Sequence, residues 1–134
     1  KEFSLEYLIG ALKKSGKAVK LVLMDQEKIG GLGNIYANDA LYLAKVMPNR
    51  KANSLSVAET KNLLAATREI INKGIKYGGA SAANYVDTKG LGGTYQDHFL
   101  VYKKDDQKCG KCGEKILKTK IGGRGTYYCP ACQK

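Results

Sequence analysis

Two closely spaced pairs of cysteines constrain the fold of this chain more than any other feature. All four cysteines of the sequence follow the spacing C-x2-C-x16-C-x2-C, as Cys109, Cys112, Cys129 and Cys132. Each C-x2-C pair places two sulfurs on one tight turn, and four thiolates can then surround a Zn²⁺ ion tetrahedrally. This spacing is typical of zinc sites and predicts one structural ion with no open coordination position. Two disulfides or a redox-active C-x-x-C are the alternatives, which neither a secretory signal nor a βαβ pattern supports.

The residues between the cysteine pairs predict a β-hairpin. Apolar residues at 116, 117 and 121 precede the glycine-rich run 122–125, and Thr126-Tyr127-Tyr128 follow it. Glycines supply the positive φ that a tight turn needs. Arg124 lies among them, either as a solvated turn residue or as a guanidinium that binds phosphate through two hydrogen bonds. The nearby basic residues are Lys111, Lys115, Lys118 and Lys120.

The charge of the chain indicates a polyanionic partner. The 134 residues include 23 Lys and Arg but 12 Asp and Glu, which gives a formal net charge of +11. A nucleic acid or an anionic membrane surface would attract such a chain. No apolar run approaches the length of a membrane-spanning helix, and the single histidine excludes a histidine-rich metal site. No serine–histidine–aspartate set or pair of carboxylates indicates catalysis.

The first two-thirds of the chain predict helices. Apolar residues recur at helical spacing from Leu5 to Leu12, with Ser4 as a candidate N-cap, and a second apolar run covers 19–24. Asn34 is predicted to cap a third helix, which ends near Pro48. The sequence Ser56-Val57-Ala58-Glu59 is a capping box that begins a longer helix. That helix is predicted to end at Gly78-Gly79.

Two segments are open to both a structural and a functional interpretation. The glycines of the run 30–33 form either a tight connection between helices or an anion site, where bare backbone amides face a helix N-terminus. Residues 80–98 lack periodicity and are either a disordered connection or a functional loop. Residues 99–102 predict a short strand before the zinc hairpin, and no role is assigned to His98.

Two motifs resemble those of the formamidopyrimidine-DNA glycosylases. Asp25-Gln26 followed by the segment 30–39 is similar to the helix–two-turn–helix motif of that family, and the segment 123–133 is similar to its zinc finger. The resemblance extends over nearly the whole chain. It implies a mainly α fold, a helix–two-turn–helix bundle over 1–98, followed by a four-cysteine zinc β-hairpin over 99–134.

The resemblance also implies roles for individual residues. Asn34, in the turn that includes Gly33, matches an asparagine that binds DNA phosphate near the lesion, and Arg124 matches an arginine that clamps the flanking phosphates. Lys17 and Lys20 lie where the family has lysines that contact the DNA backbone. The segment 80–97 matches a loop that closes over an extruded oxidised purine, although Ala82-Ala83 departs from the expected bulkier residues. The candidate residues of that loop are Ser81, Tyr85, Thr94 and Tyr95.

The family implies a bifunctional glycosylase and abasic-site lyase of base excision repair, acting on 8-oxoguanine and formamidopyrimidines. Its nucleophile is the amine of an N-terminal proline beside a glutamate, on a domain that this sequence lacks. Pro48 and Pro130 cannot replace it, because an internal proline nitrogen is a tertiary amide. The chain is therefore expected to be the inactive DNA-binding half of a monomeric, cytoplasmic, nucleoid-associated bacterial enzyme that binds damaged duplex DNA and no membrane. The alternative is a stand-alone zinc-containing nucleic-acid-binding module without catalysis.

Overall fold

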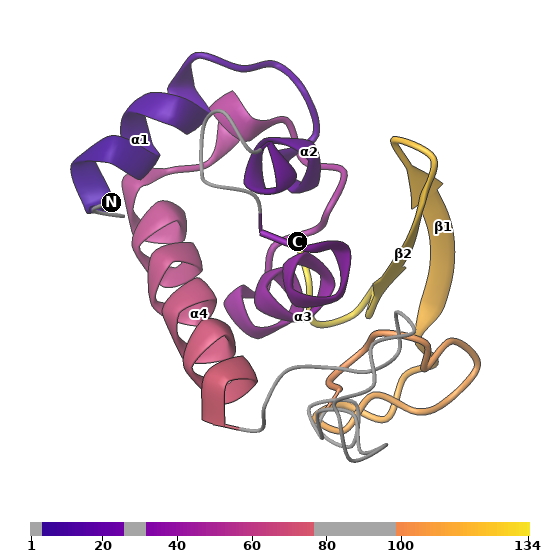
Figure 1. The fold of residues 1–134 in the computed structure, drawn as a ribbon. Coiled ribbons are helices and arrows are strands. Elements are labelled where there is room, and N and C mark those ends of the chain that lie inside the picture. The colour runs from indigo at the N-terminus through magenta and orange to yellow at the C-terminus, as the bar shows by residue number, and fades with distance from the viewer. Residues whose placement is uncertain (1–3, 26–31, 77–98) are drawn as a thin grey trace.

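The computed structural model describes residues 4–25, 32–76 and 99–134, and it confirms a mainly helical fold followed by a zinc-finger hairpin (Figure 1). Within these ranges no helix is both long enough and apolar enough to cross a membrane. The elements in chain order are the helices α1 (Leu5–Lys13), α2 (Val19–Met24) and α3 (Asn34–Ala44), the 3-10 turn η1 (Ala52–Ser54), the helix α4 (Val57–Lys76), and the strands β1 (Leu117–Ile121) and β2 (Arg124–Tyr128).

Side-chain caps begin two of the helices, as the sequence predicts. The Ser4 hydroxyl accepts a hydrogen bond from the Tyr7 amide at 3.1 Å, at the start of α1. Before α4, the Ser56 hydroxyl accepts from the Glu59 amide at 3.1 Å, while the Glu59 carboxylate accepts from the Ser56 amide at 2.9 Å. This reciprocal pair is the capping box. The predicted end of α4 at Gly78-Gly79 lies outside the described residues.

The prediction that Asn34 caps α3 is wrong. The N-cap is Gly33, which has extended backbone angles and provides no side-chain hydrogen bond, and Asn34 is the first residue of the helix. The Asn34 amide turns away from the helix end and donates to the carbonyl of Gly125, 3.2 Å away in the hairpin. A distant partner therefore overrides the local capping preference of asparagine.

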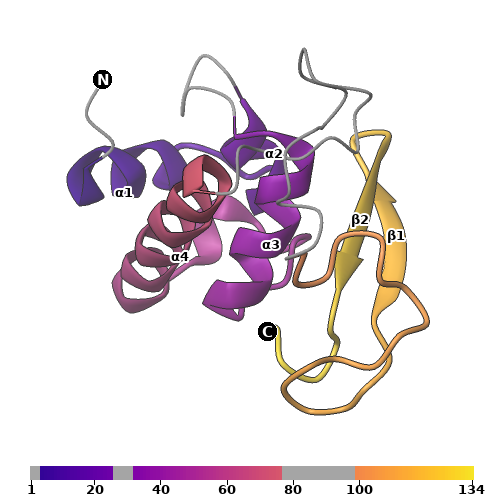
Figure 2. The same ribbon diagram turned by 60° about the horizontal axis from the view of Figure 1, so that its bottom comes forward.

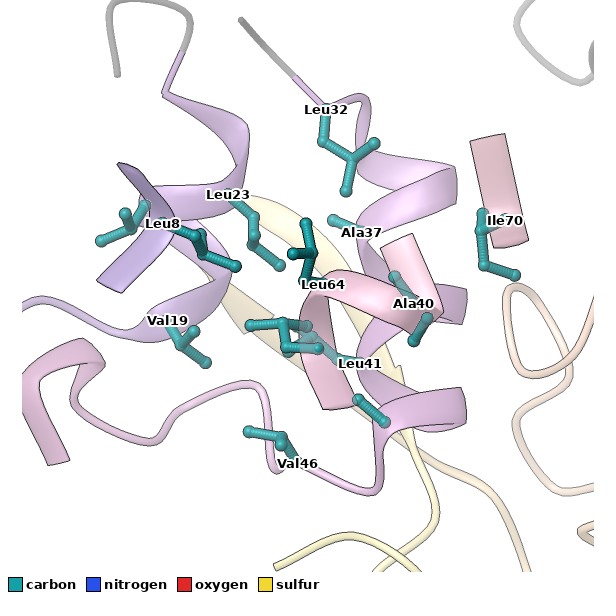
Figure 3. Close-up of a cluster of buried hydrophobic side chains, with 14 of the residues drawn as sticks. Leu8, Val19, Leu23, Leu32, Ala37, Ala40, Leu41, Val46, Leu64 and Ile70 are labelled. Atoms are coloured by element: carbon teal, nitrogen blue, oxygen red, sulfur yellow. The ribbon is translucent and has the colours of Figure 1, made fainter. Parts of the chain in front are cut away.

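One apolar core joins all four helices (Figure 3). α3 has a central place in it, between α4 and the hairpin (Figure 2). Its apolar face packs on α4, and its opposite face contacts β2. The core residues labelled in Figure 3 are Leu8, Val19, Leu23, Leu32, Ala37, Ala40, Leu41, Val46, Leu64 and Ile70.

A second, smaller cluster holds the zinc-finger segment against α3. It consists of Tyr42, Val101, Cys109, Ile116, Tyr127 and Cys129. The strands β1 and β2 are antiparallel, with Ile121 opposite Arg124. Gly122 and Gly123 form the two-residue turn at φ values of 61° and 78°, which agrees with the predicted glycine turn. Arg124 follows these glycines directly, as the first residue of β2.

The predicted strand over 99–102 is wrong. The segment has no strand partner among the described residues; instead, the amides of Leu100, Val101 and Tyr102 donate to the carboxylate of Asp39 at 3.1, 3.0 and 3.2 Å. Asp39 lies fully buried in α3, so one side chain satisfies three amides that a sheet would otherwise pair. The predicted division of the chain between residues 98 and 99 stays a prediction, because residues 77–98 lie outside the described part of the chain.

Candidate zinc centre and nucleic-acid interface

The four cysteines gather into one compact donor set. All four sulfur atoms lie within 4.8 Å of one another. The Sγ atoms are 3.7 Å apart for Cys109 and Cys132 and 3.4 Å apart for Cys112 and Cys129. Zn–S bonds of about 2.3 Å require tetrahedron edges of about 3.8 Å, whereas a disulfide would bring two sulfurs to about 2.05 Å. The geometry therefore fits one structural Zn²⁺ bound by four cysteines, as predicted.

Hydrogen bonds from backbone amides and from Tyr42 reach the sulfurs of Cys109 and Cys129. The amides of Lys111 and Cys132 point at the sulfurs of Cys109 and Cys129, both at 3.4 Å. The Tyr42 hydroxyl, from α3, lies 3.0 Å from the sulfur of Cys109. Burial raises the pKa of a thiol, but at Cys109 the hydrogen bonds from Tyr42 and from the amides of Cys112 and Lys111 prevail and lower the pKa to about 6. Burial raises the pKa of the Cys129 and Cys132 thiols. Donors of the kind found at Cys109 favour the thiolate that binds zinc.

The second cysteine pair is joined to the end of α3 through Gln133. Its side-chain oxygen accepts from the Cys129 amide at 2.8 Å, and its side-chain nitrogen donates to the Val46 carbonyl at 2.8 Å. The backbone of Lys134 adds hydrogen bonds with Lys45 and Met47 at 3.0 and 3.2 Å. The second cysteine pair is thereby connected to the segment that follows α3.

The tip of the hairpin meets α2 and α3 at a single carbonyl. The carbonyl oxygen of Gly125 accepts from Lys20 Nζ at 3.1 Å, from Asn34 Nδ2 at 3.2 Å and from Asn38 Nδ2 at 3.3 Å. Lys20 Nζ also donates to the Thr126 hydroxyl at 2.7 Å. Two consecutive helices and a strand from the far end of the chain therefore converge beside Arg124.

The environment of Lys20 differs from that of a free surface lysine. Its side chain is fully buried, and burial together with the nearby Arg124 lowers the pKa of its ammonium group to about 8. Its hydrogen bonds hold the hairpin, so a phosphate would have to approach a site already occupied by protein groups. The phosphate contact expected for Lys20 stays a prediction.

The other candidate residues are placed as follows. Arg124, Lys17 and Gly33 are exposed, whereas Asn34 is buried to all but 8 %. Asn34 uses one N–H of its amide on Gly125, and its Oδ1 is buried without a hydrogen-bond partner among the described residues. The structure thus brings the N-terminus of α3 and the start of β2 to one place. The candidates of the loop (Ser81, Tyr85, Thr94 and Tyr95), His98 and the glycines at 30 and 31 lie outside the described residues.

Sequence reasoning missed the polar face of α3. Asn34, Asn38 and Tyr42 follow one another at four-residue spacing, and each makes a hydrogen bond with the segment 99–134. Asn34 binds Gly125, Asn38 binds Gly125 and Tyr127, and Tyr42 binds Cys109. Residues at this spacing share one face of a helix. The repeat of polar residues at i, i+4 and i+8 is the signal that could have revealed this contact.

Comparison with known proteins places this architecture in a family. The profile described as "Formamidopyrimidine-DNA glycosylase H2TH domain" matches residues 1–86, and the profile "Zinc finger found in FPG and IleRS" matches residues 106–134. A formamidopyrimidine-DNA glycosylase of Listeria monocytogenes is 46 % identical over 123 residues, which are 92 % of this chain and 45 % of that protein. One of Streptococcus mutans is 42 % identical over 134 residues, which are 100 % of this chain and 49 % of that protein.

Solved structures agree with this comparison. The MutM (Fpg) protein of Thermus thermophilus superposes with a TM-score of 0.91 at 36 % identity, over 98 % of this chain and 50 % of that one. The Lactococcus lactis Fpg in complex with an abasic-site-containing DNA gives a TM-score of 0.88 at 39 % identity, over 98 % of this chain and 48 % of that one. The chain thus spans about half the length of the relatives it matches. Its helical segment and its zinc finger together show that it belongs to the formamidopyrimidine-DNA glycosylase H2TH domain family.

Proposed function

We propose that this chain is the DNA-binding part of a bifunctional DNA glycosylase and abasic-site lyase that removes oxidised purines in base excision repair. The observation that carries the proposal is the junction at Gly125, which joins the N-terminus of α3 to the start of β2. Both sides of that junction carry groups suited to phosphate. The Fpg of Lactococcus lactis, which this chain resembles over 98 % of its length, has been crystallised with abasic-site-containing DNA.

The chemistry at the junction suits the backbone of duplex DNA. The guanidinium of Arg124 is exposed and can bind two phosphate oxygens in parallel. The first turn of α3 offers backbone amides and the positive end of the helix dipole, next to the exposed Gly33. Asn34 has a second amide N–H beyond the one used on Gly125. Lys17, also exposed, adds positive charge. A Zn²⁺ ion bound by the four cysteines would keep the hairpin folded.

Base removal and strand cleavage would need residues beyond these 134. The resemblance implies that the nucleophile is the amine of an N-terminal proline, whereas Pro48 and Pro130 are internal tertiary amides. The chain alone is therefore expected to be inactive and to act with an N-terminal catalytic domain of the same monomeric protein, at the bacterial nucleoid. The loop residues Ser81, Tyr85, Thr94 and Tyr95 would face the extruded purine.

The proposal is tested by comparing wild-type chain with Arg124→Ala on duplex DNA that contains an abasic-site analogue. Loss of a charge-assisted phosphate contact should weaken binding about 10- to 100-fold. The slope of log affinity against log salt concentration should become shallower by about one, which corresponds to one phosphate contact fewer. The matched control is Lys61→Ala, which removes an exposed cation on α4.

Zinc content and thermal unfolding are measured beside affinity, so that a folding defect is recognised. Unchanged affinity and salt dependence in Arg124→Ala would contradict the phosphate role. A preference for structured RNA over damaged duplex DNA would favour the stand-alone nucleic-acid-binding module instead.

A further inference from the structure

Asn38 lies in the middle of α3 and is only 1 % exposed, so its side chain cannot contact DNA itself. Every polar atom of its amide has a protein partner. Nδ2 donates to the carbonyls of Asn34 at 2.9 Å and of Gly125 at 3.3 Å, while Oδ1 accepts from the amide of Tyr127 at 2.7 Å. One side chain therefore links the first turn of α3 to two positions of β2.

The two contacts with β2 form a fork on the open edge of the hairpin. In an antiparallel pair, alternate residues direct their N–H and C=O groups toward the partner strand and away from it. Gly125 and Tyr127 are two residues apart, opposite Lys120 and Lys118, and their peptide groups face the edge that β1 does not cover. The Asn38 amide pairs with this edge as the peptide group of a third strand would, which fixes both the register and the direction of β2 relative to α3.

This fork lies between the two groups proposed to bind phosphate. Arg124 precedes Gly125 by one residue, and Asn34 precedes Asn38 by one helical turn. Lys20 and Asn34 also bind the Gly125 carbonyl, but among the described residues only Asn38 binds the amide of Tyr127. Without Asn38, β2 would keep its pairing with β1 and the bonds of Lys20 and Asn34 at Gly125 and Thr126, but it would lose the hydrogen bond that ties Tyr127 to α3. Binding groups that act together must be held within about 0.5 Å of their working geometry.

We propose that Asn38 is a positioning residue that sets Arg124 relative to the N-terminus of α3, so that the two bind neighbouring phosphates as a single site. This inference rests on the proposed function. Asn38 contributes through the placement of Arg124 and has no contact with DNA of its own. Its loss should consequently matter only while Arg124 is present.

The test is a double-mutant cycle between Asn38→Ala and Arg124→Ala, with affinity for abasic-analogue duplex DNA as the readout. Asn38→Ala is expected to weaken binding about tenfold in the wild-type background and less than about twofold in the Arg124→Ala background. In the Lys17→Ala background the full tenfold loss should persist, because that lysine lies outside the fork. The salt slope of Asn38→Ala should move toward that of Arg124→Ala, which a general loss of stability would not produce.

The control variant is Asn62→Ala, which removes an exposed amide from α4. If Asn38→Ala fails to fold or to bind zinc, Asn38→Asp replaces it in the cycle. A protonated aspartic acid at this buried position keeps the bond to the Tyr127 amide but offers one O–H in place of the two N–H groups that bind the Asn34 and Gly125 carbonyls. If Asn38→Asp is also unfolded, Asn38→Ser, which cannot reach both positions of β2, takes its place, and the same coupling to Arg124 is expected.

Wild-type affinity in the Asn38 variants, or an equal loss with and without Arg124, would overturn the inference. The single variant Arg124→Ala separates this failure from failure of the proposed function. If Arg124→Ala alone binds normally, the phosphate role is wrong. If it weakens binding while Asn38→Ala does not, only the positioning role is wrong.

Discussion

Replacement of Gln133 by alanine should remove the hydrogen bonds that join the second cysteine pair to the segment after α3. Gln133 is 2 % exposed, and its amide makes two hydrogen bonds of 2.8 Å, from the Cys129 amide and to the Val46 carbonyl. Alanine leaves both backbone groups buried without this partner. The loss then includes the desolvation cost of each group.

The expected magnitude follows from these two contacts. Each buried backbone group left unpaired costs about 1–3 kcal/mol, and release of the ordered glutamine side chain returns about 1–2 kcal/mol. With the middle of each range, the net loss of unfolding free energy should be about 2.5 kcal/mol. Urea denaturation of the zinc-loaded chain, at a fixed concentration of free zinc, measures it.

The matched control is Gln107→Ala, since the Gln107 side chain is exposed. This variant should stay within about 0.5 kcal/mol of the wild-type chain. A Gln133→Ala variant as stable as the wild type would refute the argument, and so would equal losses in the two variants. Zinc content is determined in each sample, because loss of metal would itself destabilise the hairpin.

Three further predictions concern the metal, the capping box and the hairpin turn. Removal of zinc by a chelator should abolish the hairpin and DNA binding while α1 to α4 remain helical, as circular dichroism and affinity measurements can check; full affinity without zinc would contradict it. The hydrogen bond from Arg50, with those from Ser56, lowers the pKa of Glu59 to about 2. The ionised carboxylate therefore stabilises the folded chain above about pH 4.5, and this stabilisation is lost as the pH falls toward 2. The stability difference between wild type and Glu59→Gln should therefore shrink by about 1 kcal/mol between pH 7 and pH 3, a value discounted for the exposure of the pair; a constant difference would exclude this role. Gly123→Val should destabilise the hairpin by about 1–2 kcal/mol, because φ is 78° there, whereas Gly123→Asn should cost less; equal unfolding midpoints for the two variants would contradict it.

Several features of this protein could be read from short stretches of sequence. The spacing of the cysteines predicted a four-sulfur metal site, and the structure brings all four sulfurs within 4.8 Å of one another. Gly122 and Gly123 predicted a tight turn, and Ser56 with Glu59 predicted the start of α4. These features depend on residues within one turn of chain or one hairpin, where backbone angles and local hydrogen bonds decide the conformation.

Local reasoning failed where a distant partner decided the conformation. It assigned Asn34 to a helix cap, but the amide binds Gly125, which lies 91 residues further along the chain. It assigned a strand to residues 99–102, but Asp39 takes up the amides that a strand partner would have bound. In both cases a buried polar group found a better-placed partner from another part of the chain.

The sequence by itself determined the zinc site, the four helices, the hairpin and the positive charge of the chain. Only the tertiary structure decided which side chains stand at the candidate DNA-binding surface and which support it from behind. Asn38 looks like an ordinary polar residue in the sequence, and Lys20 was expected to contact the DNA backbone. Both are buried against β2, and the Lys20 bond to Thr126 spans 106 residues. The physical reason is that a buried polar group must be paired wherever the fold provides a partner, and that partner is known only when the elements have packed.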